Sequence, residues 1–171
     1  VEGVLGPALS ALALDMIPEE QRSRAERLAA LFSYGIPYDL DDWDGYPAAR
    51  ERLYGLCRAA GARPIVLSGD SHAFWANELS DAEHRPAGVE FGATSVTSPG
   101  ICDLLPFVPV DRFIEAANND VRFSDNGAKG FVRLTLGRHE ALGELMAVSN
   151  IQFEAYDVRV LKAYRVKSSE P

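Results

Sequence analysis

A short apolar run between a proline and a glycine places the tightest constraint on how this chain folds. Residues 65–68 read Ile-Val-Leu-Ser, follow Pro64 and precede Gly69. Upstream, Pro47 suits the first position of a helix, and an apolar stripe with helical spacing ends at Gly61. An apolar strand that directly follows a helix is typical of a buried parallel strand. The sequence therefore predicts an α/β domain built around residues 65–68.

Further elements are expected on both sides of this strand. The residues from Pro18 to Phe32 predict a helix with acids in its first turn, and Val89–Val96 predicts a second strand. Apolar and polar residues alternate in three segments of the last third of the chain: 131–136, 144–148 and 157–166. This alternation predicts an antiparallel meander. We expect a single domain, residues 1–171, that ends in antiparallel strands.

Charge and composition exclude several classes of protein. The 171 residues include 17 basic and 25 acidic side chains, a net charge of -8, and 47% of them are hydrophobic. An acidic chain without a Lys/Arg block binds polyanions poorly, so we expect no nucleic-acid partner. No run reaches the roughly 18 consecutive apolar residues of a membrane span. Two cysteines, Cys57 and Cys102, leave the redox compartment open.

The residues after the apolar run carry the most informative chemistry. Gly69 permits a tight turn, and Asp70 and His72 follow it two positions apart. Ligands gather at the carboxyl ends of strands in open α/β sheets, where loops expose side chains. A carboxylate and an imidazole so close together suit Mn, Fe, Zn or Ca. The alternative is a strand-end turn with a capping Asp70 and a surface His72, and the pattern alone leaves both interpretations open.

Ser71 offers a different chemistry. Gly69-Asp70-Ser71 matches the nucleophile block of GDS-type serine esterases, in which the serine attacks an acyl carbonyl with help from a histidine. Residues 81–84, Asp-Ala-Glu-His, supply the D-x-x-H that such enzymes use. In those esterases the two blocks lie at opposite ends of the domain, whereas here about ten residues separate them. The esterase is therefore the third interpretation.

Several blocks, in the right order, resemble the alkaline phosphatase D (PhoD-like) metallophosphoesterase family. Residues 42–50 are similar to the family's D-x-W-D-G-Y-P-x-x-R, and residues 66–77 to its strand-G-D-x-H-x-x-W-A-N block. Residues 89–98 resemble its E-F-x-x-x-S-x-T-S stretch, and residues 118–133 its N-P-H-x-x-x-x-D and G-Y segment. Together the blocks cover roughly residues 39–136. The resemblance implies a metallophosphoesterase-like (calcineurin-like) layered sandwich, of which this chain is the C-terminal portion.

The activity implied by the resemblance is metal-dependent hydrolysis of phosphate esters, of the alkaline phosphatase or phosphodiesterase type. In such enzymes two metal ions hold the phosphoryl oxygens while a metal-bound hydroxide attacks. Carried over by position, Asp70 and His72 are the metal ligands, and Trp75 and Asn77 support the ligands or contact the substrate. The metals stay open among Ca, Fe, Mn and Zn, and the partner is a small phosphate ester. Family members are commonly exported, which implies a periplasmic or secreted location.

Two departures from the family pattern qualify this expectation. Position 120 is Asp where many relatives have His. Nothing before Asp39 resembles the N-terminal motifs that supply further metal ligands in the family. We therefore expect a half-site that is inactive alone. An unpaired edge at the strand ending at Ser68 or at its neighbour should favour self-association, instability or pairing with an N-terminal half. The alternative from another class is a non-catalytic remnant that scaffolds or binds a partner.

Overall fold

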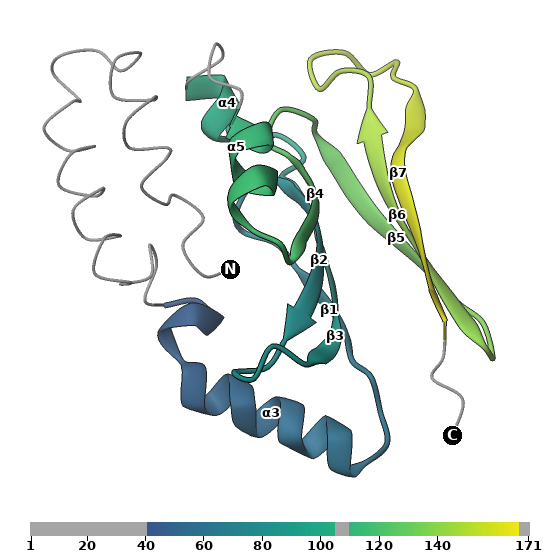
Figure 1. Ribbon diagram of the computed structural model, residues 1–171. Coiled ribbons are helices and arrows are strands. Elements are labelled where there is room, and N and C mark those ends of the chain that lie inside the picture. The colour runs from purple at the N-terminus through teal and green to yellow at the C-terminus, as the bar shows by residue number, and fades with distance from the viewer. Residues whose placement is uncertain (1–40, 105–109, 168–171) are drawn as a thin grey trace, which may run out of the picture.

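The computed structural model describes residues 41–104 and 110–167 of the chain. They form a four-stranded sheet, a three-stranded sheet and several helices (Figure 1). In chain order the elements are η2 (Trp43–Gly45), α3 (Pro47–Ala59), β1 (Ile65–Ser68), β2 (Phe74–Ser80), β3 (Pro86–Gly92), α4 (Ile101–Leu104), α5 (Val110–Ala117), β4 (Val121–Asp125), β5 (Gly130–Leu136), β6 (Glu140–Val148) and β7 (Val158–Lys167). The helix expected at residues 18–32 lies outside the described residues.

The helix and strand around Gly61 form as the sequence predicts. Pro47 is the first residue of α3, where its missing N–H leaves no helical hydrogen bond unmade. Gly61 follows the helix with a φ of 64°, a left-handed conformation that glycine adopts without strain. The chain then enters β1, which pairs in parallel with β3. The parallel pairing predicted for residues 65–68 is confirmed, but the expected burial is wrong: β1 is the end strand of the described sheet, and Leu67 is 57% exposed.

The four-stranded sheet has the order β1-β3-β2-β4, and β2 runs antiparallel to both of its neighbours. Neither β2 nor β4 is anticipated by the sequence pattern. The reason is plain for β2, which buries Phe74 and Ala76 on one face and Asn77 on the other. A strand covered on both faces lacks the alternation that marks a half-buried strand. Its apolar residues therefore give no periodic signal.

The strand expected at residues 89–96 is only partly correct. The observed strand β3 begins earlier, at Pro86, and ends at Gly92. Its parallel partner β1 ends at Ser68, whose carbonyl accepts the final hydrogen bond from Ala93 N at 2.9 Å. Beyond that bond no strand partner remains, so residues 93–96 leave the sheet as a loop.

The three-stranded sheet confirms the antiparallel meander. Its order is β5-β6-β7, with both pairs antiparallel. β6 begins at Glu140, four residues before the expected start, because a tight turn returns the chain at once. In that turn Gly137 N donates to Glu140 O at 2.8 Å.

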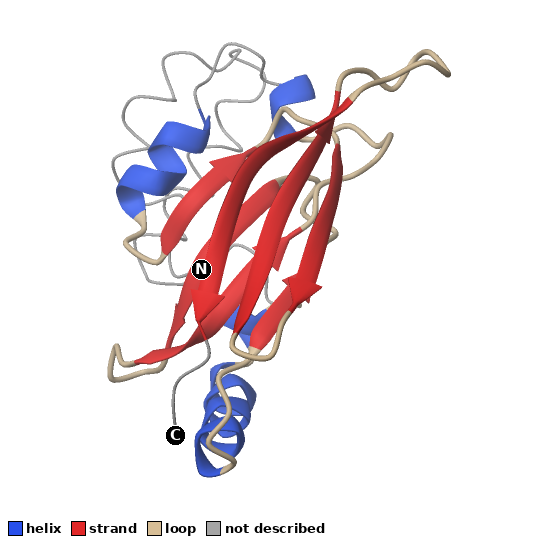
Figure 2. Cartoon of the chain, turned by 90° about the vertical axis from the view of Figure 1, so that its right-hand side faces the viewer, coloured by secondary structure: helices blue, strands red, loops and turns tan. Residues whose placement is uncertain are grey.

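The two sheets pack face to face, as Figure 2 shows, around the fully buried side chains of Phe74, Phe91 and Leu145. Gly143 of β6 makes this contact possible, because a Cβ at that position would lie 2.4 Å from Cζ of Phe91. On the other face of β2, Trp75 packs against a second cluster that α5 contributes to. At β2 the four-stranded sheet is thus covered on both faces. Within the described ranges, no helix has the length and apolarity needed to cross a membrane.

Candidate functional site

The loop between β1 and β2 brings Asp70 and His72 to the carboxyl end of a parallel strand. Both residues have left-handed backbones, with φ of 65° at Asp70 and 55° at His72. Such conformations cost non-glycine residues on the order of 1–3 kcal/mol each and persist where surrounding contacts enforce them. The Asp70 side chain is exposed, and His72 is half-buried. The local chain path is therefore maintained at an energetic cost at the two residues singled out by the sequence.

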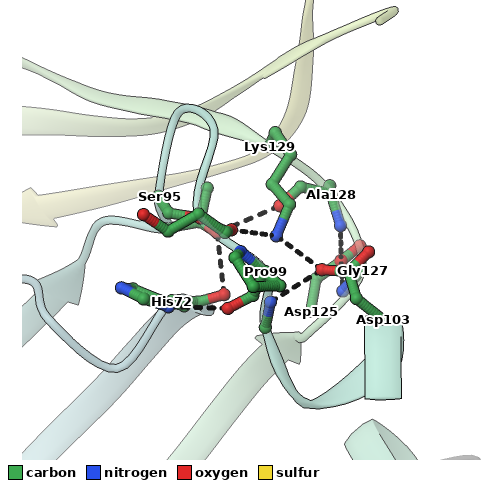
Figure 3. Close-up of polar contacts among 11 residues, drawn as sticks. His72, Ser95, Pro99, Asp103, Asp125, Gly127, Ala128 and Lys129 are labelled. Atoms are coloured by element: carbon green, nitrogen blue, oxygen red, sulfur yellow. Dashed lines mark hydrogen bonds and ion pairs between the residues drawn. The ribbon is translucent and has the colours of Figure 1, made fainter. Parts of the chain in front are cut away.

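The imidazole of His72 is oriented by a backbone carbonyl. Nδ1 of His72 lies 2.7 Å from the carbonyl oxygen of Pro99 (Figure 3). A carbonyl oxygen only accepts, so Nδ1 carries the proton and donates it. In the neutral ring the other nitrogen, Nε2, keeps its lone pair, and this is the form of histidine that ligates a metal.

The main chain of His72 is held as firmly as its ring. Oγ1 of the buried Thr94 lies 3.0 Å from the carbonyl oxygens of both His72 and Ala128, and shares its proton between them. Gly100 packs so closely that a Cβ there would lie 2.9 Å from His72 O. The loop after β3, from Thr94 to Gly100, therefore holds both the ring and the main chain of His72, and Thr94 links this loop to Ala128.

Trp75 and Asn77 both lie on the face of β2 opposite Phe74, but only Trp75 contacts the loop. Nε1 of Trp75 donates to Ser71 Oγ at 2.8 Å, which ties the loop to the first residues of β2. Nδ2 of Asn77 donates to Glu90 Oε2 at 2.9 Å on the neighbouring strand. Its Oδ1 is buried and has no hydrogen-bond partner among the described residues. Trp75 thus supports the loop directly, whereas Asn77 leaves a buried acceptor unused.

Comparison with known proteins gives this loop a context. A sequence profile of PhoD-like phosphatases matches residues 6–145, a longer segment than the blocks at 39–136. The chain belongs to the PhoD-like phosphatase family. Alkaline phosphatase D of Bacillus subtilis (strain 168) is 36% identical to it over 108 residues, in an alignment that covers 60% of this chain and 18% of that protein.

The fold agrees with this membership. A solved structure of PhoD superposes with a TM-score of 0.62 at 26% identity, and the match covers 77% of this chain and 26% of that one. The mixed α/β architecture with two sheets is therefore shared with PhoD. The PhoD-like chain spans less than a third of the length of these two relatives.

Asp120, at the position where the PhoD-like pattern has His, lies away from the Asp70–His72 loop. Its carbonyl accepts from Glu78 N at 2.8 Å, and its Oδ1 accepts from Ser80 Oγ at 3.4 Å. Ser80 closes β2 and His72 precedes it, so most of a strand, roughly 15 Å or more, separates Asp120 from the loop. Asp120 therefore belongs to the opposite end of the sheet.

Distance also argues against the serine esterase interpretation. Ser71 precedes β2 and His84 follows it, which places them roughly 20 Å apart along the strand. Asp81 of the D-x-x-H is fully buried at its side chain and pairs with Arg58 and Arg85, each at 2.7 Å. Neither Asp81 nor His84 is therefore within reach of Ser71.

Asp81 also belongs to the densest acidic group of the described residues, together with Glu51 and Glu83. Burial by itself would raise the pKa of Asp81, but hydrogen bonds from Arg85 and Arg58 outweigh burial and hold it well below its usual range. Glu51 accepts from Ala82 N at 3.0 Å. The group is thus neutralised by arginines and backbone amides, and stabilises the β2–β3 turn.

Sequence reasoning missed the residues that hold His72: Thr94, Pro99, Gly100, Asp103 and Lys129. The Pro99-Gly100 pair does signal a turn. No spacing rule, however, indicates which carbonyl of a turn will face a side chain 27 residues away. A threonine and a lysine at such positions carry no recognisable pattern either.

Proposed function

We propose that this chain forms part of a metal-dependent phosphoesterase whose metal ions are ligated by Asp70 and His72. The hydrogen bond from His72 Nδ1 to Pro99 O carries this proposal. Metal-ligating histidines almost always donate their other ring N–H to a carbonyl or carboxylate, which fixes the tautomer and the ring orientation. The exposed carboxylate of Asp70, two residues away on the same loop, adds an oxygen donor.

This pair of donors fits the metals implied by the family. A carboxylate oxygen and a neutral imidazole nitrogen suit Zn, Mn and Fe, and Ca is favoured less because imidazole is not its preferred ligand. When bound, such ions supply Lewis acidity to phosphoryl oxygens and lower the pKa of a water molecule. The chain's own contribution is position: Thr94 and Pro99 fix His72, and Trp75 fixes the loop through Ser71.

We also propose that the site needs donors from elsewhere and that the described part of this chain is inactive alone. A dinuclear centre needs more ligands than one carboxylate and one imidazole supply. The Glu51–Asp81–Glu83 group cannot provide them, because it lies at the far end of β2 and is engaged by arginines. A small phosphate ester is the proposed substrate.

The other expectations that come from the family resemblance are proposals as well. Two packed sheets with helices outside them support a calcineurin-like sandwich, with residues 1–171 as one domain. A periplasmic or secreted location, like the use of Ca, Fe, Mn or Zn, rests on the resemblance to the family.

A second function is favoured by one observation, the open edge of β1. In the described sheet, β1 has β3 on one side only. An edge strand presents backbone groups that another strand can pair with. The chain would then act as a scaffold for a second copy or for a longer segment of the protein.

Metal content tests the proposal. We expect about one metal ion per chain by elemental analysis after incubation with Mn²⁺ and desalting, a lower content in Asp70→Asn and His72→Ala, and no hydrolysis of p-nitrophenyl phosphate. Equal metal content in wild type and both variants would refute the ligand assignment. Two metals per chain, with hydrolysis abolished by His72→Ala, would refute the half-site.

A further inference from the structure

We infer that Lys129 and Asp103 position the imidazole of His72 by restraining the turn that carries Pro99. What this positioning does for catalysis rests on the proposed function, whereas the positioning of the ring itself does not. Lys129 lies in the loop between β4 and β5, and Asp103 lies in α4, so neither residue belongs to the β1–β2 loop. Both act on His72 through the turn Ser98–Pro99–Gly100.

Side chains restrain both flanks of Pro99. On the N-terminal flank, the carbonyl of Ser98 accepts from Lys129 Nζ at 2.8 Å and from Ser95 Oγ at 2.6 Å. On the C-terminal flank, the amide of Gly100 donates to Asp103 Oδ2 at 2.6 Å. The peptide units on either side of Pro99 are therefore fixed, and its carbonyl is directed at Nδ1 of His72 (Figure 3).

Lys129 joins the two flanks into one unit. Its Nζ lies 2.9 Å from the same Asp103 Oδ2 that accepts from Gly100, and its side chain is only 10% exposed. An ammonium group so nearly buried is costly unless it is paired and hydrogen-bonded. The ion pair and the Ser98 carbonyl satisfy two of its three donors. Lys129 thereby connects the two flanks of the turn.

The turn also lies directly against the histidine. A Cβ on Gly100 would be 2.9 Å from His72 O, 3.3 Å from Asn126 O and 3.6 Å from Lys129 Nζ. Packing this close leaves no room for the turn to move without moving its neighbours. If Lys129 is removed, the Pro99 carbonyl loses its fixed direction and Nδ1 of His72 loses its acceptor.

The tautomer of His72 reports this positioning without any metal. In a folded, metal-free chain labelled with ¹⁵N-histidine, we expect His72 in the Nδ1–H tautomer at a pH where its ring is neutral. In Lys129→Met we expect a substantial fraction of the Nε2–H tautomer and roughly 10-fold weaker Mn²⁺ binding, the size of effect typical of residues that orient ligands. Lys167→Met, the same change at an exposed residue, should match wild type.

The outcomes separate this inference from the proposed function. An unchanged tautomer in folded Lys129→Met would overturn the inference even if wild type binds Mn²⁺. A changed tautomer in a chain whose wild type binds no Mn²⁺ would support the positioning role and count against the metal site. If Lys129→Met does not fold, Asp103→Asn serves instead, since its amide oxygen still accepts from Gly100 N. A partial shift in Asp103→Asn supports the inference, and none overturns it.

Discussion

The carbonyl oxygen of Pro99 lies 2.7 Å from Nδ1 of His72, although 27 residues separate the two along the chain. This contact joins the loop after β1 to the loop after β3, and those two strands are parallel neighbours in the sheet. Parallel pairing places the ends of both strands at the same edge. The sheet topology therefore brings an acceptor to the histidine, whose Nε2 has no hydrogen-bond partner among the described residues.

Removing the Thr94 hydroxyl should weaken both the fold and the site. Thr94→Val keeps the shape of the side chain but leaves the carbonyls of His72 and Ala128 without their buried donor. We expect the free energy of unfolding, measured in urea, to fall by about 1–3 kcal/mol. Mn²⁺ affinity should fall with it. Thr97→Val, an exposed change nearby, should alter neither, and a stable Thr94→Val with full affinity would contradict the role of the hydroxyl.

Two glycine-to-alanine changes should have opposite signs. Gly143→Ala places a methyl group against the buried ring of Phe91, at 2.4 Å from Cζ, so overpacking should destabilise the fold by about 1–3 kcal/mol. Gly55→Ala, inside α3, meets no atom within 4 Å and should stabilise by up to about 1 kcal/mol. Melting temperatures compare the two. A neutral Gly143→Ala would mean that the sheets are not packed at this point.

Acid should destabilise the chain at pH values below about 4. Basic partners hold the pKa of four carboxyl groups below the ordinary value: Glu78, Asp81, Asp103 and Glu144. Because their pKa values are lower in the folded state than in the unfolded state, the stability they add is complete above the unfolded pKa, about 4. It is lost as pH falls through the lower, folded values.

Asp81→Asn isolates the largest of these effects. It should lower the melting temperature at pH 7, and its difference from wild type should shrink as the pH falls below about 4. Glu154→Gln, in an exposed loop, should follow the wild-type profile throughout. A constant difference between Asp81→Asn and wild type across this range would show that the charge of Asp81 does not contribute.

The open edge of β1 should support self-association. Pro64 O accepts from Val89 N of β3, and Ser68 O accepts from Ala93 N just after β3. Alternation therefore directs the backbone groups of Ile65 and Leu67 toward the other side. We expect mass to rise with concentration in light scattering. Leu67→Pro removes one donor from the open edge and should reduce association, whereas Leu67→Ala keeps the donor and should reduce it less. A monomer at all concentrations would contradict the prediction.

The sequence predicts the elements that carry clear end signals or a regular alternation of apolar and polar residues. Helix α3 has clear end signals at Pro47 and Gly61, although Tyr54 is its only buried residue, and β5 alternates because one of its faces is turned toward the core. The sequence pattern does not predict β2, because both faces of this strand are covered. One face packs against the three-stranded sheet and the other against the cluster that includes Trp75. Pattern methods detect periodic exposure, and such a strand has little.

Of the candidate site, too, only one part could be predicted from the sequence. Asp70 and His72 are recognisable because they are close in sequence and follow a short apolar strand. Their supporting residues, from Thr94 to Lys129, are brought in by strand pairing and by close packing at Gly100. Such contacts depend on tertiary geometry, which no local pattern encodes.

Ligation of a metal by His72 is tested most directly by Zn²⁺ titration of the ¹⁵N-histidine-labelled chain. The chain has three histidines, His72, His84 and His139, so the latter two serve as internal controls. We predict that the Nε2 resonance of His72, assigned through His72→Gln, shifts saturably with Zn²⁺ while the other two histidines stay unchanged. A shift that Asp70→Asn weakens would complete the assignment. No shift at His72, or equal shifts at all three histidines, would contradict the metal site.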